Sequence, residues 1–226
     1  MNRTPRLLDL FSCAGGAAMG YHRAGFEVVG VDILTQPRYP FEHHVADALE
    51  FLAAHGEEFD VIHASPPCQA YSPLHALSPH LEYPDLVAAT RSALDALGKP
   101  YVIENVMAAP LDRDHSIVLC GGMFGLRTYR HRRFESRIPL RPPTHPKHVI
   151  RTATRQRRAR WAQGWHISVT GDVGRYVGPE AMGIDWMSGD ELCQAIPPAY
   201  TEHIGEQLRT HLTDPSGRMA LFEAVA

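Results

Sequence analysis

The segment that best combines a reactive side chain with a rigid backbone is Ser65-Pro66-Pro67-Cys68-Gln69, which follows an apolar run containing Phe59, Val61 and Ile62. Proline fixes φ and has no N–H to donate, so a strand that runs into two prolines ends abruptly. We therefore expect Cys68 on a stiff loop at the carboxyl edge of a sheet, where open α/β sheets bind their ligands. A thiol there could act as a nucleophile; the alternative is a structural cysteine that packs as a small apolar side chain.

A second candidate site is the turn Phe11-Ser12-Cys13-Ala14-Gly15-Gly16, between a predicted strand and a predicted helix. Small residues let a backbone approach a ligand and present N–H groups at a helix N-terminus. Asp32 ends the next predicted strand about 20 residues later, where an acid accepts hydrogen bonds from ribose hydroxyls in nucleoside-binding folds. Together these features predict an adenosine-type cofactor. The turn is not GxGxxG and no Lys-Ser/Thr follows it, so neither a dinucleotide fingerprint nor a P-loop is indicated.

The order of the predicted elements indicates the fold class. Apolar runs alternate with amphipathic segments, and this βαβ rhythm predicts a Rossmann-like α/β fold, a mostly parallel sheet with helices on both faces. Strands are expected at 7–11, 27–32, 43–46, 59–64, 101–106, 117–120 and 132–138, of which the last two could form a hairpin; helices are expected at 17–24, 48–54, 84–97 and 199–212.

The rhythm breaks after Ile138, where a basic stretch rich in proline begins. We therefore expect four parts in the chain. They are an α/β domain with the cofactor and cysteine loops at 1–138, a small irregular basic lobe at 139–180, a return to the α/β domain at 181–213 and a tail at 214–226.

The charges of the 226-residue chain are unevenly distributed. The net charge is −3, yet 12 of the 22 lysines and arginines lie between Arg127 and Arg160, against the single acid Glu135. A solvated basic face is the ordinary explanation of a charge run. A cluster this one-sided in a mostly acidic protein favours a polyanion as partner, most often nucleic acid.

The sequence carries no membrane, secretion or metal signal. No apolar run approaches the roughly 20 residues of a membrane span, and no signal peptide precedes the first predicted strand. The cysteines lack a CxxC spacing, which is typical of reduced thiols in a cytoplasmic protein rather than of disulfides or a zinc site. The 14 histidines are scattered without a metal-ligand spacing. We therefore expect a cytoplasmic protein without a metal site or a membrane contact.

The chain resembles the DNA cytosine carbon-5 methyltransferases. Six segments match the motifs of that family in the family's order, and the ordered set is far more specific than any single motif. They are Asp9-Leu10-Phe11-Ser12-Cys13-Ala14-Gly15-Gly16, Pro67-Cys68-Gln69, Glu104-Asn105-Val106, Leu119-Cys120-Gly121, Arg130-His131-Arg132 and Ala195-Ile196-Pro197-Pro198. Short phage-encoded members of the family would fit the compact length, which implies the cytoplasm of a bacterium or of a phage-infected cell.

The resemblance implies S-adenosylmethionine as the cofactor. Phe11 would stack on the adenine, Asp32 would hold the ribose, and Asp47 would contact the adenine amino group. The cofactor set that the resemblance implies is Phe11, Ser12, Cys13, Ala14, Gly15, Gly16, Asp32, Ile33, Asp47, Ala48, Pro67, Gln194 and Ala195.

The resemblance also implies the catalytic residues and explains their types. Cys68 would add to carbon 6 of cytosine, because carbon 5 becomes nucleophilic only after a strong nucleophile has added there. A free thiol with a pKa of ~8.5 is mostly protonated at neutral pH, so the site must favour the thiolate or remove its proton. Glu104 would donate to N3, since burial can raise the pKa of a carboxyl group; otherwise it is a partly exposed acid at a strand end. Arg132, with Arg130, would support Glu104 and the base.

A cysteine cannot reach carbon 6 inside stacked DNA, so the resemblance implies a duplex from which the cytosine is flipped. Trp161 or Trp165 could fill the gap that the base leaves, although packing in a core is the expected role of both. The implied DNA contacts are Gln69, Ser72, Arg151, Arg155, Arg157, Arg158 and Arg160.

The chain departs from the family pattern in three places. Thr128 stands where the arginine motif usually has glutamine, and Gln194 stands where the last motif usually has asparagine. The lobe at 139–180 is shorter than the family's target-recognition region. The chain could therefore read a short site, depend on a partner subunit for specificity, or act on single-stranded DNA, RNA or a free cytosine nucleotide.

Competing functions fit the sequence less well. A non-catalytic DNA-binding relative would have no need of both Cys68 and Glu104. A nicotinamide-dependent dehydrogenase would be expected to carry GxGxxG, and an adenine-amino methyltransferase would carry Asn/Asp-Pro-Pro-Tyr/Phe in place of Ser-Pro-Pro-Cys. The function that the resemblance implies is cytosine methylation of DNA, in restriction–modification, phage self-protection or regulation.

Overall fold

The computed structural model describes residues 3–71, 84–171 and 176–214, and its central element is a seven-stranded sheet in the order β3-β2-β1-β4-β5-β7-β6. Strands β1 to β5 run parallel, and β7 is antiparallel to both of its neighbours. The strands are β1 (Arg6–Leu10), β2 (Glu27–Asp32), β3 (Glu42–Val45), β4 (Val61–Ala64), β5 (Tyr101–Asn105), β6 (Ser116–Leu119) and β7 (Arg132–Ser136).

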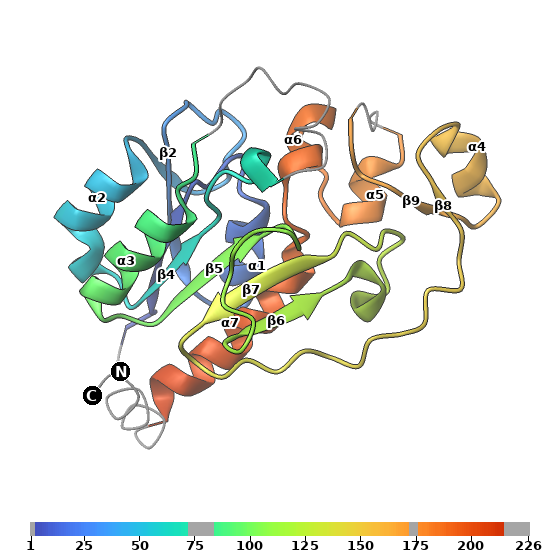
Figure 1. Ribbon diagram of the computed structural model, residues 1–226. Helices are drawn as coiled ribbons and strands as arrows, with labels where there is room; N and C mark the ends of the chain where they lie inside the picture. The colour runs from blue at the N-terminus through green and yellow to red at the C-terminus, as the bar shows by residue number, and fades with distance from the viewer. Residues whose placement is uncertain (1–2, 72–83, 172–175, 215–226) are drawn as a thin grey trace.

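Helices cover both faces of the sheet (Figure 1). Helices α1 (Gly16–Arg23) and α7 (Pro198–Thr213) contribute to one hydrophobic cluster, and α2 (Ala48–His55) and α3 (Val87–Leu97) contribute to the other. Gly20 lets α1 and α7 approach closely, because a Cβ there would lie 2.1 Å from the carbonyl oxygen of Pro198. The parallel sheet with helices on both faces confirms the predicted Rossmann-like class.

The predicted elements agree with the structure, with small shifts at their ends. The strand expected at 59–64 begins at Val61, after a 3₁₀ turn at Gly56–Glu58 that Phe59 caps. The helix expected at 84–97 begins at Val87, whose backbone N–H donates to Asp85. Strands β6 and β7 form the hairpin that the sequence suggested. The tail expected at 214–226 lies, beyond Asp214, outside the described residues.

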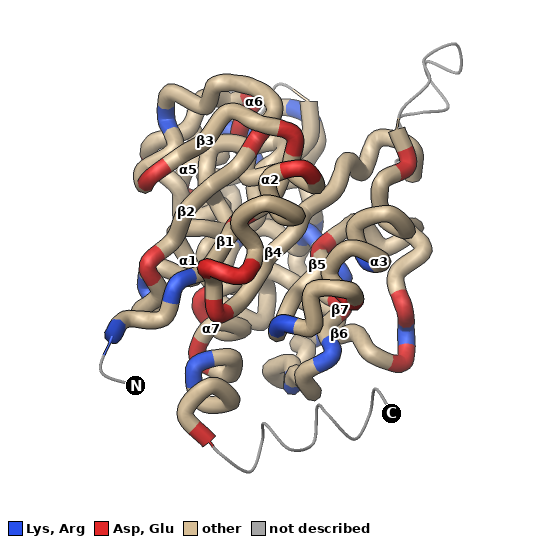
Figure 2. The backbone as a smooth tube through the Cα atoms, turned by 90° about the vertical axis from the view of Figure 1, so that its left-hand side faces the viewer, with Lys and Arg blue, Asp and Glu red and all other residues tan. Residues whose placement is uncertain are grey.

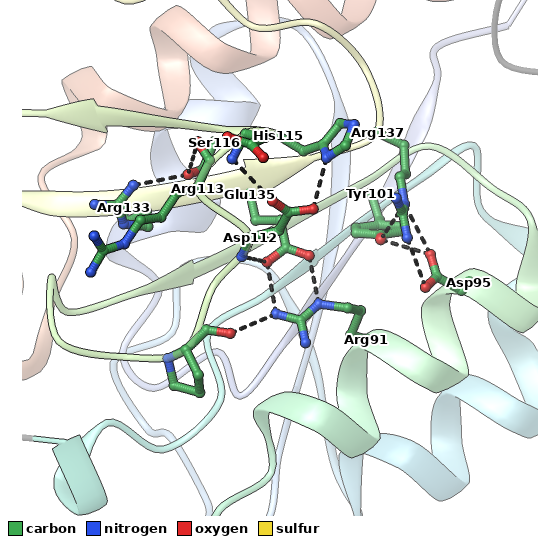
Figure 3. A network of polar contacts seen from close by, with 12 residues as sticks. Arg91, Asp95, Tyr101, Asp112, Arg113, His115, Ser116, Arg133, Glu135 and Arg137 are labelled. Atoms are coloured by element: carbon green, nitrogen blue, oxygen red, sulfur yellow. Dashed lines mark hydrogen bonds and ion pairs between the residues drawn. The ribbon is translucent and has the colours of Figure 1, made fainter. Parts of the chain in front are cut away.

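A buried ion pair fixes the antiparallel strand β7 to the rest of the fold (Figure 3). Glu135 of β7 is 1% exposed, and both of its carboxylate oxygens accept from the guanidinium of Arg91 on α3, at 2.7 and 2.8 Å. The backbone N–H of Asp112 donates to the same carboxylate. An exposed pair, Arg137 with Asp95, continues the network at the end of the strand.

Residues 137–151 form a long connection without helix or strand that leads from β7 to a small lobe (Figure 1). The lobe contains β8 (Thr152–Ala153), β9 (His166–Ile167), α4 (Arg157–Ala162) and α5 (Gly178–Met182). Its hydrophobic cluster also includes Ala14, in the loop after β1, and Ala195, so the lobe shares a core with the α/β domain. The predicted domain boundaries at 138, 180 and 213 stay predictions.

The two tryptophans of the lobe have a packing role. Trp161 and Trp165 are partly buried and pack against the hydrophobic cluster of the lobe, in line with the packing role expected of both. The guanidinium of Arg127 stacks 3.5 Å from the ring centre of Trp161 and donates to the carbonyl oxygens of both tryptophans. Arg127 therefore fastens α4 to the chain that precedes β7.

The side of the molecule that carries α2 and β3 bears charges of both signs, with acidic segments spread from α2 to α7 and basic segments between them (Figure 2). Among the described residues, no helix combines the length and the apolarity needed to cross a membrane.

The ion pair between Arg91 and Glu135 predicts a measurable contribution to stability. Arg91→Met leaves a buried carboxylate without its cation, and we expect the free energy of unfolding in urea to fall by about 3 kcal/mol. Arg137→Met removes the exposed partner of Asp95 and serves as the matched control, with an expected loss below about 1 kcal/mol. Equal losses in the two variants would contradict a structural role for the buried pair.

Candidate active site

The carboxyl ends of β1, β2, β4 and β5 surround one cavity of about 340 Å³. The carboxyl ends of parallel strands meet at one edge of a sheet, which is why segments far apart in the sequence line the same cavity. The residues of the lining that the sequence analysis had singled out are Phe11, Ser12, Cys13, Ala14, Gly16, Asp32, Ile33, Asp47, Ala48, Pro67, Cys68, Gln69, Glu104, Arg132, Gln194 and Ala195.

The loop after β1 has an unusual backbone that Asp32 holds in place. Phe11 and Cys13 have positive φ angles of 58° and 44°, which non-glycine residues rarely adopt. The backbone N–H of Cys13 donates to Oδ2 of Asp32 at 2.9 Å, and the N–H of Leu34 donates to Oδ1. Asp32 therefore stabilises the turn around the cavity in addition to lining it.

The lining of this end of the cavity fits a nucleoside. Ile33 is 71% exposed although it is a large apolar residue, and it lines the cavity together with the ring of Phe11. Asp47 caps α2 and also faces the cavity, so two carboxylates and two apolar surfaces lie together. The hydroxyl of Ser12 is buried and has no hydrogen-bond partner among the described residues. A ligand with hydroxyl or amino groups would satisfy these polar atoms, because buried polar groups are normally hydrogen-bonded.

The segment after α6 (Gly189–Gln194) closes the cavity from the other side. Cys13 contacts the side-chain oxygen of Gln194 at 3.8 Å, and a Cβ on Gly16 would lie 2.5 Å from the carbonyl oxygen of Ile196. Gly15 does not line the cavity; it precedes α1 with a φ of 81°, and a Cβ there would meet Tyr39 and Pro40. Its contribution is the turn itself, which only a glycine adopts without strain.

Cys68 lies on the loop that the two prolines predict. Strand β4 ends at Ala64, and the side-chain amide of Asn105 donates to the carbonyl oxygen of Pro66 at 2.9 Å, which ties this loop to the end of β5. The thiol is half-buried. Burial raises its pKa, the neighbouring Glu104 raises it further, and Arg132 opposes both effects. The raised pKa favours the protonated thiol at neutral pH.

Glu104 is the buried acid of the cavity. It is 5% exposed, and Nε of Arg132 lies 3.1 Å from its Oε1. Burial raises the pKa of Glu104, whereas Arg132 and the hydroxyl of Ser65 lower it by stabilising the ionised carboxylate. The register of β5 and β7 pairs Glu104 with Phe134, so Arg132, two residues earlier on β7, reaches Glu104 diagonally across the strands.

A buried hydrogen-bond chain ends at Glu104, and the sequence analysis did not include it. Tyr21 and His63 are fully buried; the Tyr21 hydroxyl lies 2.9 Å from Nδ1 of His63, and Nε2 of His63 lies 2.9 Å from the Ser65 hydroxyl. An ionised Glu104 accepts only, so Ser65 donates to it, His63 donates to Ser65, and Tyr21 donates to His63. Burial lowers the pKa of His63 to about 3, so its ring is neutral. The feature of the sequence that could have indicated this chain is His63, a histidine inside the otherwise apolar strand β4.

Arg130 has contacts other than those the resemblance implies. Its guanidinium donates to the carbonyl oxygens of Ala195, Val169 and Cys193 at 2.9, 2.8 and 2.6 Å, and it does not line the cavity. Burial lowers its pKa to about 9. Arg130 thus joins the lobe to the end of α6, and its charge, like that of Arg132, lowers the pKa of Glu104 and of Cys68. Of the two arginines, Arg132 is the one whose guanidinium forms an ion pair with Glu104.

The residues expected to contact DNA are divided between the cavity and the lobe. Gln69 lines the cavity, and Ser72 lies outside the described residues. Of the five lobe arginines, Arg151, Arg155 and Arg158 are exposed, although Arg151 also lies over the ring of Trp165 and Arg158 over that of Tyr176. The other two are half-buried: Arg157 donates to the carbonyl oxygen of Thr170, and Arg160 lies over the ring of Trp165. Other basic residues between positions 127 and 160, including Arg127 and Arg130, donate hydrogen bonds to carbonyl oxygens within the protein. The charge available to a polyanion is therefore smaller than the composition suggests.

Comparison with known proteins supports the fold. No family model matches the chain, and no curated protein matches it significantly. Among solved structures, the Entamoeba histolytica methyltransferase EhMeth has a TM-score of 0.61 and 13% identity, and covers 94% of this chain and 100% of its own. A prophage-encoded E. coli protein described as a DNA modification methyltransferase has a TM-score of 0.55 and 14% identity, with 93% and 100% covered. The S. pombe methyltransferase Dnmt2 has a TM-score of 0.52 and 10% identity, with 94% and 100% covered. The chain therefore has the fold of these methyltransferases.

The contacts of Glu104 predict how its pKa responds to substitution. Arg132→Met and Ser65→Ala should each raise the pKa, because each removes a group that stabilises the ionised carboxylate, and Arg132 should have the larger effect. The measurement is a pH titration of the carboxyl carbon of Glu104 by NMR, with Glu104→Gln to assign the signal. Arg133→Met, on the same strand but bonded to Ser116, is the control. An unchanged pKa in Arg132→Met would contradict the ion pair.

Proposed function

We propose that this protein is a methyltransferase that uses S-adenosylmethionine to methylate carbon 5 of cytosine in DNA. The observation that carries the proposal is the meeting of Cys68, Glu104 and Arg132 in the same cavity as the loop after β1. A nucleophile, a buried acid and a cation that faces that acid are what the addition of a thiol to a pyrimidine ring requires. The DNA modification protein among the structural neighbours is consistent with a DNA substrate.

The cofactor would occupy the end of the cavity formed by the loop after β1. Phe11 and Ile33 would contact the adenine, Asp32 and Asp47 would accept from its ribose and amino groups, and the unpartnered hydroxyl of Ser12 would gain a partner. When bound, S-adenosylmethionine supplies an electrophilic methyl group. The cavity extends from these residues to Cys68 and Glu104, so the cofactor and the target base would be neighbours.

The catalytic pair would work with one proton shared between two groups. Cys68 must be a thiolate to attack carbon 6, and Glu104 must be protonated to donate to N3. Burial raises the pKa of both groups, and their mutual repulsion disfavours the doubly ionised state. The sulfur–carbon bond forms as the ring electrons move towards N3, which takes the proton of Glu104. Carbon 5, made nucleophilic by the addition, would then take the methyl group. Loss of the carbon-5 proton would expel the thiolate of Cys68, and N3 would return its proton to Glu104, which restores the ring.

Arg132 would influence the protonation of both Cys68 and Glu104. Its charge lowers the pKa of Glu104 and of Cys68, so it favours the thiolate and limits the protonation of both groups at once. Below the pKa of Glu104 both groups are protonated, and above the pKa of Cys68 both are ionised. Between the two pKa values the pair holds one proton, and the form in which Glu104 carries that proton is the active one. The rate is therefore expected to follow a bell-shaped pH profile.

The exposed arginines of the lobe would bind the backbone of DNA. Neutralised phosphates release counterions, and the resulting free energy offsets the few kcal/mol needed to extrude a base. Arg158 lies on α4 and Arg155 lies two residues before it, on the lobe whose hydrophobic core includes Ala14 and Ala195 beside the cavity. A DNA surface at α4 would thus be continuous with the entrance to the site.

The reaction can be tested by transfer of labelled methyl groups to unmethylated duplex DNA, followed by bisulfite sequencing. We expect the label on carbon 5 of cytosine in one sequence context. Cys68→Ala should lower the rate to background while calorimetry shows unchanged binding of S-adenosylmethionine, because Cys68 serves the base rather than the cofactor.

Other outcomes of the same assay separate the alternatives. If the Cys68→Ala variant transferred labelled methyl groups at the wild-type rate, that result would contradict covalent catalysis by Cys68. Label on RNA, single-stranded DNA or deoxycytidine nucleotides but not on duplex DNA would correct the substrate. Cofactor and DNA binding without label on any substrate would indicate a binding protein or dependence on a partner subunit.

The position of the DNA surface has its own test. The double variant Arg155→Gln, Arg158→Gln should weaken DNA binding and reduce the slope of log K against log salt by about 2, since each phosphate contact contributes about 0.9. Arg23→Gln, at the far end of α1 from the cavity, is the matched control and should leave the slope unchanged. An unchanged slope in the double variant would place the DNA surface elsewhere.

A further inference from the structure

A cysteine and three histidines meet at the end of the β6–β7 hairpin. One ligand atom from each of Cys120, His131, His145 and His148 lies within 4.8 Å of all the others. Nε2 of His131 is 3.2 Å from Nε2 of His145, and Sγ of Cys120 is 3.3 Å from Nε2 of His148. The cluster is separate from the cavity, since none of the four residues lines it.

These distances suit a tetrahedral metal ion. Zn²⁺ binds imidazole nitrogen at ~2.0–2.1 Å and thiolate sulfur at ~2.3 Å, so neighbouring ligand atoms in a tetrahedron lie about 3.3–3.6 Å apart. The two closest pairs of this cluster have nearly that spacing. One thiolate and three neutral imidazoles form a donor set of borderline softness, which suits Zn²⁺ better than Ca²⁺ or Mg²⁺.

The fold brings the ligands together from three segments. The register pairs Leu119 with Arg132, and one residue further along the hairpin Cys120 lies opposite His131. The connection at 137–151 then passes the hairpin and supplies His145 and His148. The sequence analysis predicted no metal site because these residues have no familiar spacing, and only the hairpin and the returning connection make them neighbours.

Surrounding contacts hold the histidines in position before any ion is present. The ring of Tyr129 stacks on His148 at a centroid distance of 3.7 Å, and its hydroxyl bonds to the backbone of Ile150. Cys120 is buried, whereas His145 and His148 are exposed, which leaves a path for an ion to enter.

We propose that Cys120, His131, His145 and His148 form a structural Zn²⁺ site. All four positions of the tetrahedron come from the protein, as in structural rather than catalytic zinc sites. Binding exchanges the thiol proton of Cys120, which leaves to solvent, for a zinc–sulfur bond.

The position of the site indicates its purpose. His131 is the residue between Arg130 and Arg132, so a bound ion would fix the start of β7, which directs Arg132 to Glu104. It would also fasten the 137–151 connection, which leads to the lobe. This inference does not rest on the proposed function, because it concerns the ion and the fold alone.

The first test is the metal content of the full-length protein by mass spectrometry after purification without chelator. We expect about one zinc per chain for the wild type. His145→Ala and His148→Ala change exposed ligands and should fold, yet each should lose more Zn²⁺ affinity than the ~10–100-fold typical of outer-shell changes. His115→Ala, an exposed histidine paired with Asp112 outside the cluster, should keep the zinc.

The second test follows the sulfur ligand with Co²⁺ as probe. Metal-free wild-type protein titrated with Co²⁺ should show the intense visible bands of tetrahedral cobalt and a thiolate charge-transfer band in the near ultraviolet. Cys120→Ser should lose the charge-transfer band, and Cys68→Ser should keep it. Absence of zinc and of both cobalt signals in folded wild-type protein would overturn the site. Equal zinc content in wild type and His145→Ala would overturn this ligand set.

Discussion

The interaction on which the site depends is the ion pair between Glu104 and Arg132. A carboxylate that is 5% exposed is costly to ionise without a nearby cation. Arg132 supplies that cation from the antiparallel strand β7, at 3.1 Å. The hairpin of β6 and β7 therefore has a chemical role in this sheet, since it brings a positive charge to the carboxyl end of β5. The buried pair of Glu135 with Arg91 fixes the same strand from its other end.

The cavity combines two kinds of chemistry at one sheet edge. At one end, carboxylates and exposed apolar side chains surround an unpartnered hydroxyl, which is an environment for a nucleoside. At the other end, a protonated thiol faces a buried acid, and a hydrogen-bond chain from Tyr21 through His63 and Ser65 supports that acid. Burial alone would leave both titratable groups neutral. Arg132 opposes that tendency, because its charge lowers the pKa of both groups.

Much of the fold was readable from the sequence, because apolar runs and breaker residues act locally. The strand before Cys68, the proline-stiffened loop and the hairpin were all predicted with small errors at their ends. The site residues that motif order indicates lie around one cavity, apart from Gly15 and Arg130, while their roles stay predictions. What local patterns could not predict was the direction of long side chains. Arg130 turns to three carbonyl oxygens, several basic residues hold the fold, and His145 and His148 reach Cys120 only through a long irregular connection.

In the proposed reaction, the sulfur of Cys68 bonds to carbon 6 of a cytosine. The most direct measurement uses duplex DNA in which 5-fluorocytosine replaces the target base, because the final step needs a removable hydrogen on carbon 5 and fluorine cannot leave in its place. With S-adenosylmethionine present, mass spectrometry of the digested complex should find the modified nucleotide on the peptide that contains Cys68. An adduct on another cysteine, or methylated product from normal DNA with no adduct from the fluorinated DNA, would contradict the account.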